Sequence, residues 1–508
     1  MTKARPAELP TSIETAQAMI ATLTEQNTRL VREVEQLRHR LDILCRKMFG
    51  RSSEKVDSSQ LSLAFAALSM PEPSAPQPVG VEKVRVKTKP TGRKAFPKDL
   101  PRRRVVLDVA EAEKTCSCGA AKELIGEAVN EKLDYVPASV QVVELVRPRY
   151  ACLKCHDGVT EAKAPPQAIE GSLAAEGLLA QIVVSKYVDH LPLHRLEGIF
   201  ARQGVELSRS TMCGLVAKVT EAVAPLCEAL RHSTLASSYV QTDDTPVTVL
   251  AEDVGRFTGR VWVYLDPVGK QVVFDATDSR GRDGPLDFLE GFGGYLQGDA
   301  YAGYDAVRRR GGVILLGCMA HARRYFIEAL DKDPHAAVFI ALIKRLYEIE
   351  REASGLSFGE RRALRQSRSA PLLRELFLFA KETEPKVLPK SPLGEAVKYL
   401  KNQSRYLAQY IRDGRLEIDN NGAERQLRAI VIGRKNWLFT GSMEGAHRAA
   451  ALYSLVQTCK LAGVEPWEYL RDVLGRLPAH PHSRIAELLP AAWAVARTAS
   501  ATEATPAA

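Results

Sequence analysis

The most constraining pattern in the sequence is a heptad repeat near its N-terminus. From residue 13 to residue 48, apolar side chains recur at alternating steps of three and four. The a positions hold Ile13, Ile20, Asn27, Val34, Leu41 and Met48, and the d positions hold Ala16, Leu23, Leu30, Leu37 and Leu44. Such a run is typical of a coiled coil, and an asparagine at an a position favours a parallel dimer in register. We therefore predict a leucine zipper over residues 13–50 that forms a homodimer or higher oligomer. The alternative is a helix that packs on its own protein.

Residues 51–104 have the composition of a flexible linker. Serines are followed by a proline-rich run over residues 71–78 and then by a basic stretch. Residues 83–104 contain ten basic side chains and the single acid Asp99, whereas the whole chain has a formal net charge of +9. A concentrated basic segment indicates a polyanionic partner, and nucleic acid is the first candidate. The alternative is a solvated linker, which charge alone does not exclude.

The apolar segments are too short for a membrane protein. The longest runs, such as residues 312–316, fall far short of the ~20 residues that a membrane helix needs. No charged start leads into an apolar leader. We expect a cytoplasmic, nucleoid-associated protein without a membrane partner.

Four of the nine cysteines form two close pairs, Cys116 with Cys118 and Cys152 with Cys155. Two pairs in tight turns can supply four thiolates to a tetrahedral Zn²⁺ ion. Residues 140–150, between the pairs, have a strand-like composition, as in a zinc ribbon. We predict a zinc-binding module over residues 105–165, with His156 as a substitute ligand. The alternative, small buried hydrophobic side chains, leaves the pairing unexplained.

A helical pattern over residues 170–232 has the outline of a helix-turn-helix DNA-binding domain. One helix is expected over residues 193–202, Gly204 ends it, and Ser208 caps a second helix over residues 209–219. That arrangement would present Arg209, Ser210 and Thr211 to DNA. Any helical hairpin has the same outline.

The next part of the chain alternates strands and helices. Strands are expected over residues 239–241, 261–265, 271–274, 294–297 and 313–316, with helices over residues 285–292 and from residue 320 onward. Three successive strands, a crossover helix and further strands fit a mixed α/β sheet of the ribonuclease H type. The ends of adjacent strands in such a sheet can bring Asp243 and Asp299 together.

A third carboxylate, Glu424, opens a helix predicted through residue 428. Three such carboxylates could hold two divalent ions about 3.5–4 Å apart for displacement at phosphorus. Oxygen ligands suit Mg²⁺ or Mn²⁺. The alternative readings are turn-capping aspartates and a capping pair of Asn421 with Glu424.

Several phrases of the sequence resemble the bacterial transposases of the insertion sequence sixty-six family. They are the two cysteine pairs and residues 51–55, 186–193, 243–246, 294–304, 318–324, 418–425 and 433–438. The likeness runs in order from about residue 15 to about residue 495. It implies an Asp-Asp-Glu transposase with a ribonuclease H-like core, whose triad falls on Asp243, Asp299 and Glu424. The family's first motif usually reads Asp-Glu-Thr, so Asp244 is the alternative first ligand here. The first cysteine pair is also one residue shorter than the usual spacing.

The resemblance leads to a multidomain α/β organisation. A catalytic domain over residues 235–445 contains a large α-helical insertion at about 330–410 and is followed by a C-terminal helical region over residues 446–496. Residues from about 498 onward are expected to be disordered. Near the insertion, Cys318 and His321 have the spacing of half a metal site, for which a core cysteine and a structural or phosphate-contacting histidine is the favoured reading.

Basic and aromatic residues near these motifs are candidates for DNA contacts. Residues 308–310 and 323–324 could hold the DNA backbone. Lys435 could contact a phosphate and Trp437 could stack on an unpaired base. The alternative for these two is a hairpin with one packed aromatic.

Together these patterns predict a transposase that binds the ends of an insertion sequence and catalyses metal-dependent cleavage and transfer of strands into target DNA. Its partners would be double-stranded DNA, further copies of the chain and, as the resemblance suggests, small accessory proteins of the same element. Two other functions fit part of the pattern. A non-catalytic DNA-binding regulator would leave the acidic motifs without a role, and a nuclease of the same fold would cut without joining.

Overall fold

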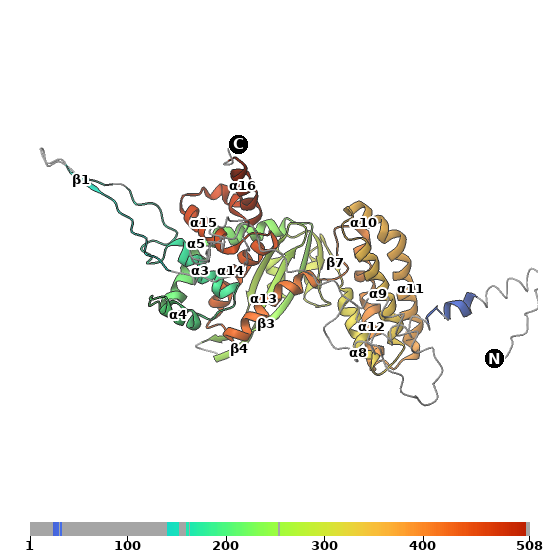
Figure 1. Ribbon diagram of the computed structural model, residues 1–508. Coiled ribbons are helices and arrows are strands. Elements are labelled where there is room, and N and C mark those ends of the chain that lie inside the picture. The colour runs from blue at the N-terminus through green and yellow to red at the C-terminus, as the bar shows by residue number, and fades with distance from the viewer. Residues whose placement is uncertain are drawn as a thin grey trace, which may run out of the picture. The chain divides into compact units, whose positions relative to one another are not determined.

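The computed structural model describes residues 24–29, 31–32, 140–151, 159–161, 163–251 and 255–503 (Figure 1). Within the predicted zipper, residues 24–29 and 31–32 are helical. The remainder of the zipper, the linker over residues 51–104 and the four cysteines Cys116, Cys118, Cys152 and Cys155 lie outside the described residues.

The strand predicted over residues 140–150 is wrong for most of its length. Strand β1, Arg149–Ala151, pairs antiparallel with β2, Val159–Glu161, whereas residues 140–148 have no regular secondary structure. Val142, Val143 and Val146 are exposed. A β-branched composition produces a strand only where a neighbour supplies hydrogen bonds and cover, and within the described residues no strand pairs with residues 140–148.

The helical hairpin has the predicted outline but a longer second helix. Helices α3 (Glu176–Tyr187) and α4 (Leu193–Arg202) precede α5, Arg209–Leu235. The chain reverses at Gly204, whose φ of +80° suits glycine, and the Thr211 amide donates to Ser208 Oγ at 3.1 Å. Helix α5 continues through Pro225 instead of ending at residue 219, because its buried face packs on β5 and α14.

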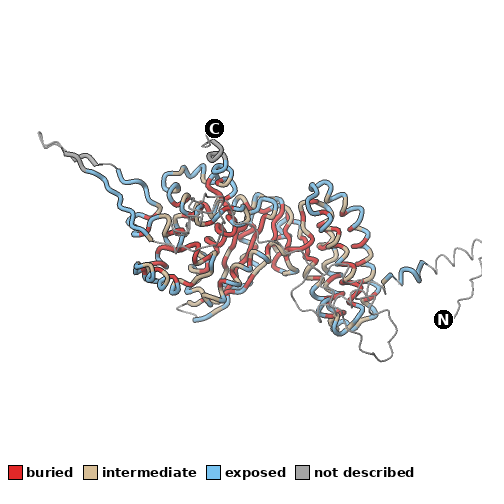
Figure 2. The backbone as a smooth tube through the Cα atoms, viewed as in Figure 1, coloured by how far each residue is buried: buried red, intermediate tan, exposed pale blue. Residues whose placement is uncertain are grey.

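A five-stranded mixed sheet forms the core, as expected. Its order is β5-β4-β3-β6-β7, with bounds Gln271–Thr277, Gly255–Asp266, Tyr239–Ala251, Gly294–Gln297 and Val313–Leu316. β3, β4 and β5 pair antiparallel, whereas β6 and β7 continue the sheet in parallel with β3. β6 and β7 have their predicted bounds, but β3 and β4 extend each other into a long hairpin. Figure 2 shows that the strands are buried along most of their length.

Helices cover this sheet and close its edge. α6 (Asp283–Phe288) and α7 (Tyr304–Arg309) connect strands, and α13 (Asn421–Trp437) packs on β3 and β4. α14 (Met443–Leu461) lies along the edge strand β5, whose Val272 and Phe274 amides donate to Thr458 Oγ1 and Ser454 Oγ at 3.1 and 2.8 Å. These side chains satisfy the hydrogen bonds of an edge that would otherwise be open to pairing.

The C-terminal region is helical. It contains α15 (Pro466–Arg476), the short helices η5 (Leu477–Ala479) and η6 (His482–Leu488), and α16 (Pro490–Glu503). Disorder from residue 498 is therefore wrong as far as residue 503. The alanine-rich sequence there has good helix propensity and continues a helix that is anchored by Trp493.

The segment between β7 and α13 forms a separate helical layer with its own core. It comprises α8 (Met319–Leu330), α9 (Ala336–Glu352), α10 (Phe358–Leu364), η2 (Arg365–Ser369), α11 (Ala370–Thr383), η3 (Glu384–Lys386), α12 (Pro392–Leu407) and η4 (Gln409–Arg412). Phe326 stacks on Phe339 in this core, at 4.2 Å between ring centroids. The buried Arg365 pairs with Glu350 at 2.6 Å and donates to the carbonyls of Tyr410 and Asp413. These bonds hold the segment around Tyr410 and Asp413, which leads from the helical layer to α13.

Candidate active site

The register of the sheet places two aspartates side by side. Gln241 of β3 is opposite Gln297 of the parallel strand β6. Asp243 and Asp299 each lie two residues beyond that pair, and neighbouring strands are about 4.8 Å apart. The two carboxyl groups therefore emerge at the same end of adjacent strands.

Asp243 and Asp244 have different surroundings, because successive strand residues point to opposite faces. The Asp244 carboxylate is 2% exposed and accepts from Arg260 Nη1 at 2.9 Å and from Arg280 Nε at 3.0 Å. Among the described residues, Asp243 forms no ion pair with an arginine. Burial raises its pKa to about 7, the amide of Asp244 lowers it, and the charges of Asp299, Glu424 and Asp244 raise it further. The charges of both other predicted carboxylates therefore act on Asp243.

Buried amide side chains connect the start of α13 to β3. Gln241 Nε2 donates to the Asp419 carbonyl at 3.0 Å, and the Ala423 amide donates to Gln241 Oε1 at 3.2 Å. Asn420 Nδ2 donates to the Thr242 carbonyl at 3.2 Å. A Cβ on Gly422 would lie 2.3 Å from Gln241 Oε1, so only glycine fits in this close approach. These contacts fix Glu424, in the first turn of α13, beside the strand that carries Asp243.

Arg280 is a site residue that the sequence did not indicate. Besides Asp244, its guanidinium reaches Asp299 Oδ2 at 3.4 Å, and it lies 4.8 Å from the centroid of the Tyr301 ring. The amide of Tyr301 donates to Asp299 Oδ1 at 3.1 Å. Asp299 is therefore oriented from two sides. No local sequence pattern predicts that an arginine in the loop after β5 contacts a carboxylate on another strand.

Cys318 and His321 flank Glu424. Their ligand atoms and those of Glu424 lie within 4.8 Å of one another, and His321 Nε2 is 3.8 Å from Glu424 Oε1. Burial raises the pKa of the Cys318 thiol to about 12, which keeps it neutral. Burial lowers the pKa of His321, and the charge of Glu424 opposes this effect. A neutral buried thiol fits a core cysteine, and the histidine lies next to the third carboxylate.

The predicted DNA contacts lie elsewhere on the surface. Arg209 and Ser210 are exposed and Thr211 is half-buried at the start of α5, where Ser208 Oγ is 2.8 Å from Ser210 Oγ. Lys435 is exposed in the last turn of α13. Trp437 ends the same helix and packs against the core, so this segment is not the hairpin of the alternative reading.

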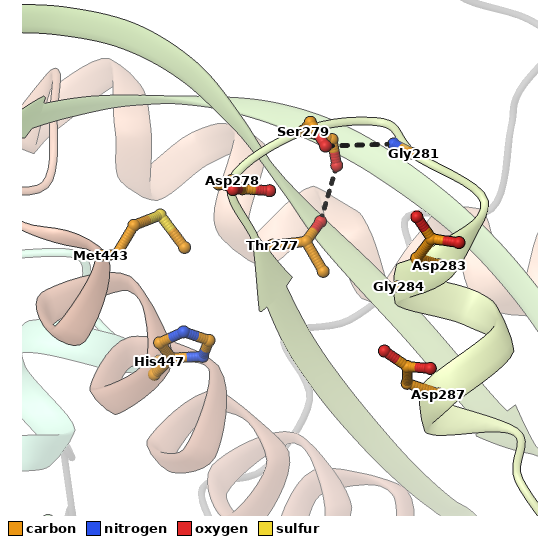
Figure 3. Close-up of a pocket in the computed structure, with 9 residues that line it drawn as sticks. All are labelled: Thr277, Asp278, Ser279, Gly281, Asp283, Gly284, Asp287, Met443 and His447. Carbon is orange, nitrogen blue, oxygen red and sulfur yellow. Dashed lines mark hydrogen bonds between the residues drawn. The ribbon is translucent and has the colours of Figure 1, made fainter. Parts of the chain in front are cut away.

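A pocket of about 410 Å³ lies between α6, α14 and the end of β5 (Figure 3). Ser279 and Gly281 line it, whereas Arg280 between them reaches Asp244 and Asp299. Thr277 Oγ1 donates to the Ser279 carbonyl at 2.8 Å, and the Gly281 amide lies 3.3 Å from Ser279 Oγ. The pocket does not contain the three carboxylates. Its wall holds the loop that carries Arg280.

Comparison with models of protein families shows to which family the chain belongs. The model described as "Transposase IS66 family" matches residues 171–448. The chain belongs to the IS66 transposase family. Three further models of that family match: the IS66 C-terminal element over residues 454–491, the zinc-finger binding domain of transposase IS66 over residues 113–156, and "Transposase C of IS166 homeodomain" over residues 36–105. These matches imply a multidomain transposase that binds DNA and zinc.

Related proteins of similar length occur in Sinorhizobium fredii (strain NBRC 101917 / NGR234). "Uncharacterized protein y4qI" is 34% identical over 94% of this chain and 92% of its own length. "Uncharacterized protein y4jD" is 33% identical over 93% and 97%, and "Uncharacterized protein y4hP" is 32% identical over 91% and 89%. Among the described residues, no helix is long and apolar enough to cross a membrane.

Proposed function

We propose that this IS66-family protein cleaves the ends of its insertion sequence and joins them to target DNA, with Asp243, Asp299 and Glu424 as the catalytic carboxylates. The observation that carries the proposal is the convergence of these side chains from β3, from the end of β6 and from α13. Three antiparallel strands followed by two parallel ones are also the order of a ribonuclease H-like sheet, in which the first and fourth strands are neighbours.

The cluster fits divalent metal ions. Burial, together with the charges of Asp299 and Glu424, raises the pKa of Asp243, and Glu424 Oε1 is buried without a hydrogen-bond partner among the described residues. Oxygen donors of this kind suit Mg²⁺ or Mn²⁺. When bound, two such ions would activate the attacking oxygen and stabilise the leaving one.

The chain's own groups orient this site. Arg280 and the Tyr301 amide hold Asp299, and the Gln241 and Asn420 side chains hold the first turn of α13. Asp244, bound to two arginines, would neutralise Arg260 and Arg280 next to the site and leave Asp243 as the first ligand.

The other modules would bring DNA and a second subunit to the site. Arg209, Ser210 and Thr211 at the exposed start of α5 would contact DNA, and Lys435 would contact a phosphate. Trp437 would pack between this surface and the core and would not stack on a base. Cys116, Cys118, Cys152 and Cys155 would hold the Zn²⁺ ion, and the zipper would pair subunits so that two element ends meet on nucleoid DNA in the cytoplasm.

The test is a strand-transfer assay with full-length protein, labelled element-end DNA, target plasmid and Mg²⁺. Asp299→Asn should bind the element end like the parent and form no joined product. The matched control is Asp283→Asn, the same change at an exposed surface acid, which should join normally. Joining by Asp299→Asn would refute the assignment. Cleaved but unjoined product from the parent would favour a nuclease, and neither product, with accessory proteins of the element present, would favour a DNA-binding regulator.

A further inference from the structure

The exposed face of α13 is unusually basic. After Glu424, the exposed residues of this helix are Arg425, Arg428, Ile432 and Lys435, at steps of three, four and three. Residues at these steps lie on one side of a helix. α13 contains no acidic residue besides Glu424. The face therefore presents a row of positive charges that begins beside the carboxylate cluster.

Within the described parts of the chain, Arg425, Arg428 and Lys435 form no ion pair or side-chain hydrogen bond. Arg434, on the inner side of the same helix, donates instead to Thr245 Oγ1 at 2.9 Å and to the Pro246 carbonyl. A row of unpaired like charges is unfavourable in the free protein and is typical of a surface that binds a polyanion.

Two apolar side chains stand at the end of this row. Leu438 is 67% exposed and Phe439 is 46% exposed. Leu438 has a φ of +65°, a conformation that disfavours any residue with a Cβ, and such strain tends to persist where a site requires it.

The backbone around these side chains is fixed. The Leu438 amide donates to the Arg434 carbonyl at 2.8 Å. The Thr440 amide donates to the Thr248 carbonyl and the Leu250 amide to the Thr440 carbonyl, both at 2.9 Å, which attaches this segment to β3. The backbone that carries Leu438 and Phe439 is therefore held in place, while the Leu438 side chain is mostly exposed and the Phe439 side chain is partly exposed.

We propose that the duplex end of the insertion sequence lies along α13, with phosphates at Arg425, Arg428 and Lys435 and a base step opened by Leu438 and Phe439. Leu438 follows Glu424 by fourteen residue steps along this helix, a rise of roughly 21 Å. The opened step is therefore about six base pairs from the cleaved bond, at about 3.4 Å per base pair. Apolar side chains that insert between base pairs unstack them and bend the duplex. This inference rests on the proposed function, since it assigns the DNA surface of the same site.

Binding should be measured in the Asp299→Asn background, so that DNA contact is separated from chemistry. The slope of log affinity against log salt for the element-end duplex should fall by about 0.9 for each of Arg428→Ala and Lys435→Ala. Arg374→Ala, the same change at an exposed arginine of α11, is the matched control and should leave the slope unchanged. Unchanged slopes in the α13 variants would overturn the proposal. A slope that falls only for target DNA would also overturn it, because the face would then bind the target.

The proposed opening of a base step by Leu438 and Phe439 is tested with 2-aminopurine. This base is placed at each position four to eight base pairs from the cleaved bond. The parent should raise the fluorescence at one step near the sixth pair. Leu438→Gly combined with Phe439→Ala should abolish the rise, whereas Val268→Ala, a change at another exposed apolar residue, should not. Glycine relieves the positive φ, so a lost signal in a protein with unchanged thermal stability cannot be attributed to misfolding. If the fluorescence does not rise with the parent, or still rises with the double variant, Leu438 and Phe439 do not open a base step. This conclusion holds even if Asp299→Asn has abolished joining as proposed.

Discussion

Replacing Asp243 by asparagine should stabilise the metal-free protein at alkaline pH. The carboxyl ionises near pH 3.8 in an ordinary setting and near pH 7 in the fold, where burial and the charges of Asp299, Glu424 and Asp244 oppose its ionisation. Folding therefore favours the protonated form. The parent loses stability as the pH rises from about 4 to about 7, and the full cost is present above pH 7. Asparagine, which stays neutral, avoids this cost.

The size of the effect follows from the pKa shift. About three pH units at 1.36 kcal/mol each give an upper limit of about 4 kcal/mol. Water near the half-buried cluster screens the charges, so a gain of about 1–2 kcal/mol is expected. At roughly 2–4 °C per kcal/mol for a domain of this size, the thermal midpoint should rise by about 2–8 °C at pH 8.

The assay is thermal unfolding of the parent, Asp243→Asn and Asp283→Asn in chelator, at pH 4, 6 and 8. The midpoint of Asp243→Asn should exceed that of the parent at pH 8 and converge with it at pH 4, whereas the surface control should follow the parent throughout. Millimolar Mn²⁺ should raise the midpoint of the parent and not that of Asp243→Asn, because binding to the folded state stabilises it. A variant that is less stable than the parent at pH 8, or a difference that does not depend on pH, would refute the reasoning.

Three further outcomes follow from the site. Gly422→Ala should lower the free energy of unfolding by about 1–3 kcal/mol and greatly reduce joining, because its Cβ would lie 2.3 Å from Gln241 Oε1. Gly359→Ala, with open space around it, should change neither property. Unfolding and strand-transfer assays check both variants. Joining should fall about ten-fold per pH unit on the acid side because Asp243 must lose its proton, and the midpoint should move toward pH 7 as Mg²⁺ is lowered; a profile unaffected by Mg²⁺ would argue against it. Metal analysis should find one Zn²⁺ per chain, lost in Cys152→Ser and kept in Cys213→Ser, a free exposed cysteine.

Local patterns predicted the parts of the fold in which neighbouring residues carry the information. β6 and β7 are short strands between turns, and their bounds agree with the sequence prediction. The lengths of β3 and α5 were underestimated, because each is extended by partners distant in sequence: β4 for the strand, and β5 with α14 for the helix.

The sequence likewise named some residues of the candidate site but not the contacts between them. Composition and spacing offered three acids as candidates, and the family resemblance selected Asp243, Asp299 and Glu424 together, since nothing local relates Glu424 to β3. The distinction between Asp243 and Asp244 depends on Arg260 and Arg280, whose contacts arise from strand pairing and a loop. The position of His321 beside Glu424 and the Gln241 hydrogen-bond network were not predicted, for the same reason. Side chains that meet only in the folded protein leave no signal in a single sequence.

The central claim, that these carboxylates hold the catalytic metal, is tested most directly by a change of ligand. Asp299→Cys replaces an oxygen donor by a thiolate, which binds Mg²⁺ poorly and softer divalent ions well. In the strand-transfer assay, the variant should form joined product with Mn²⁺ and none with Mg²⁺, whereas the parent should use both. Equal joining by Asp299→Cys with the two ions would contradict the account, because Asp299 would then not be a ligand of the metal that catalyses the reaction.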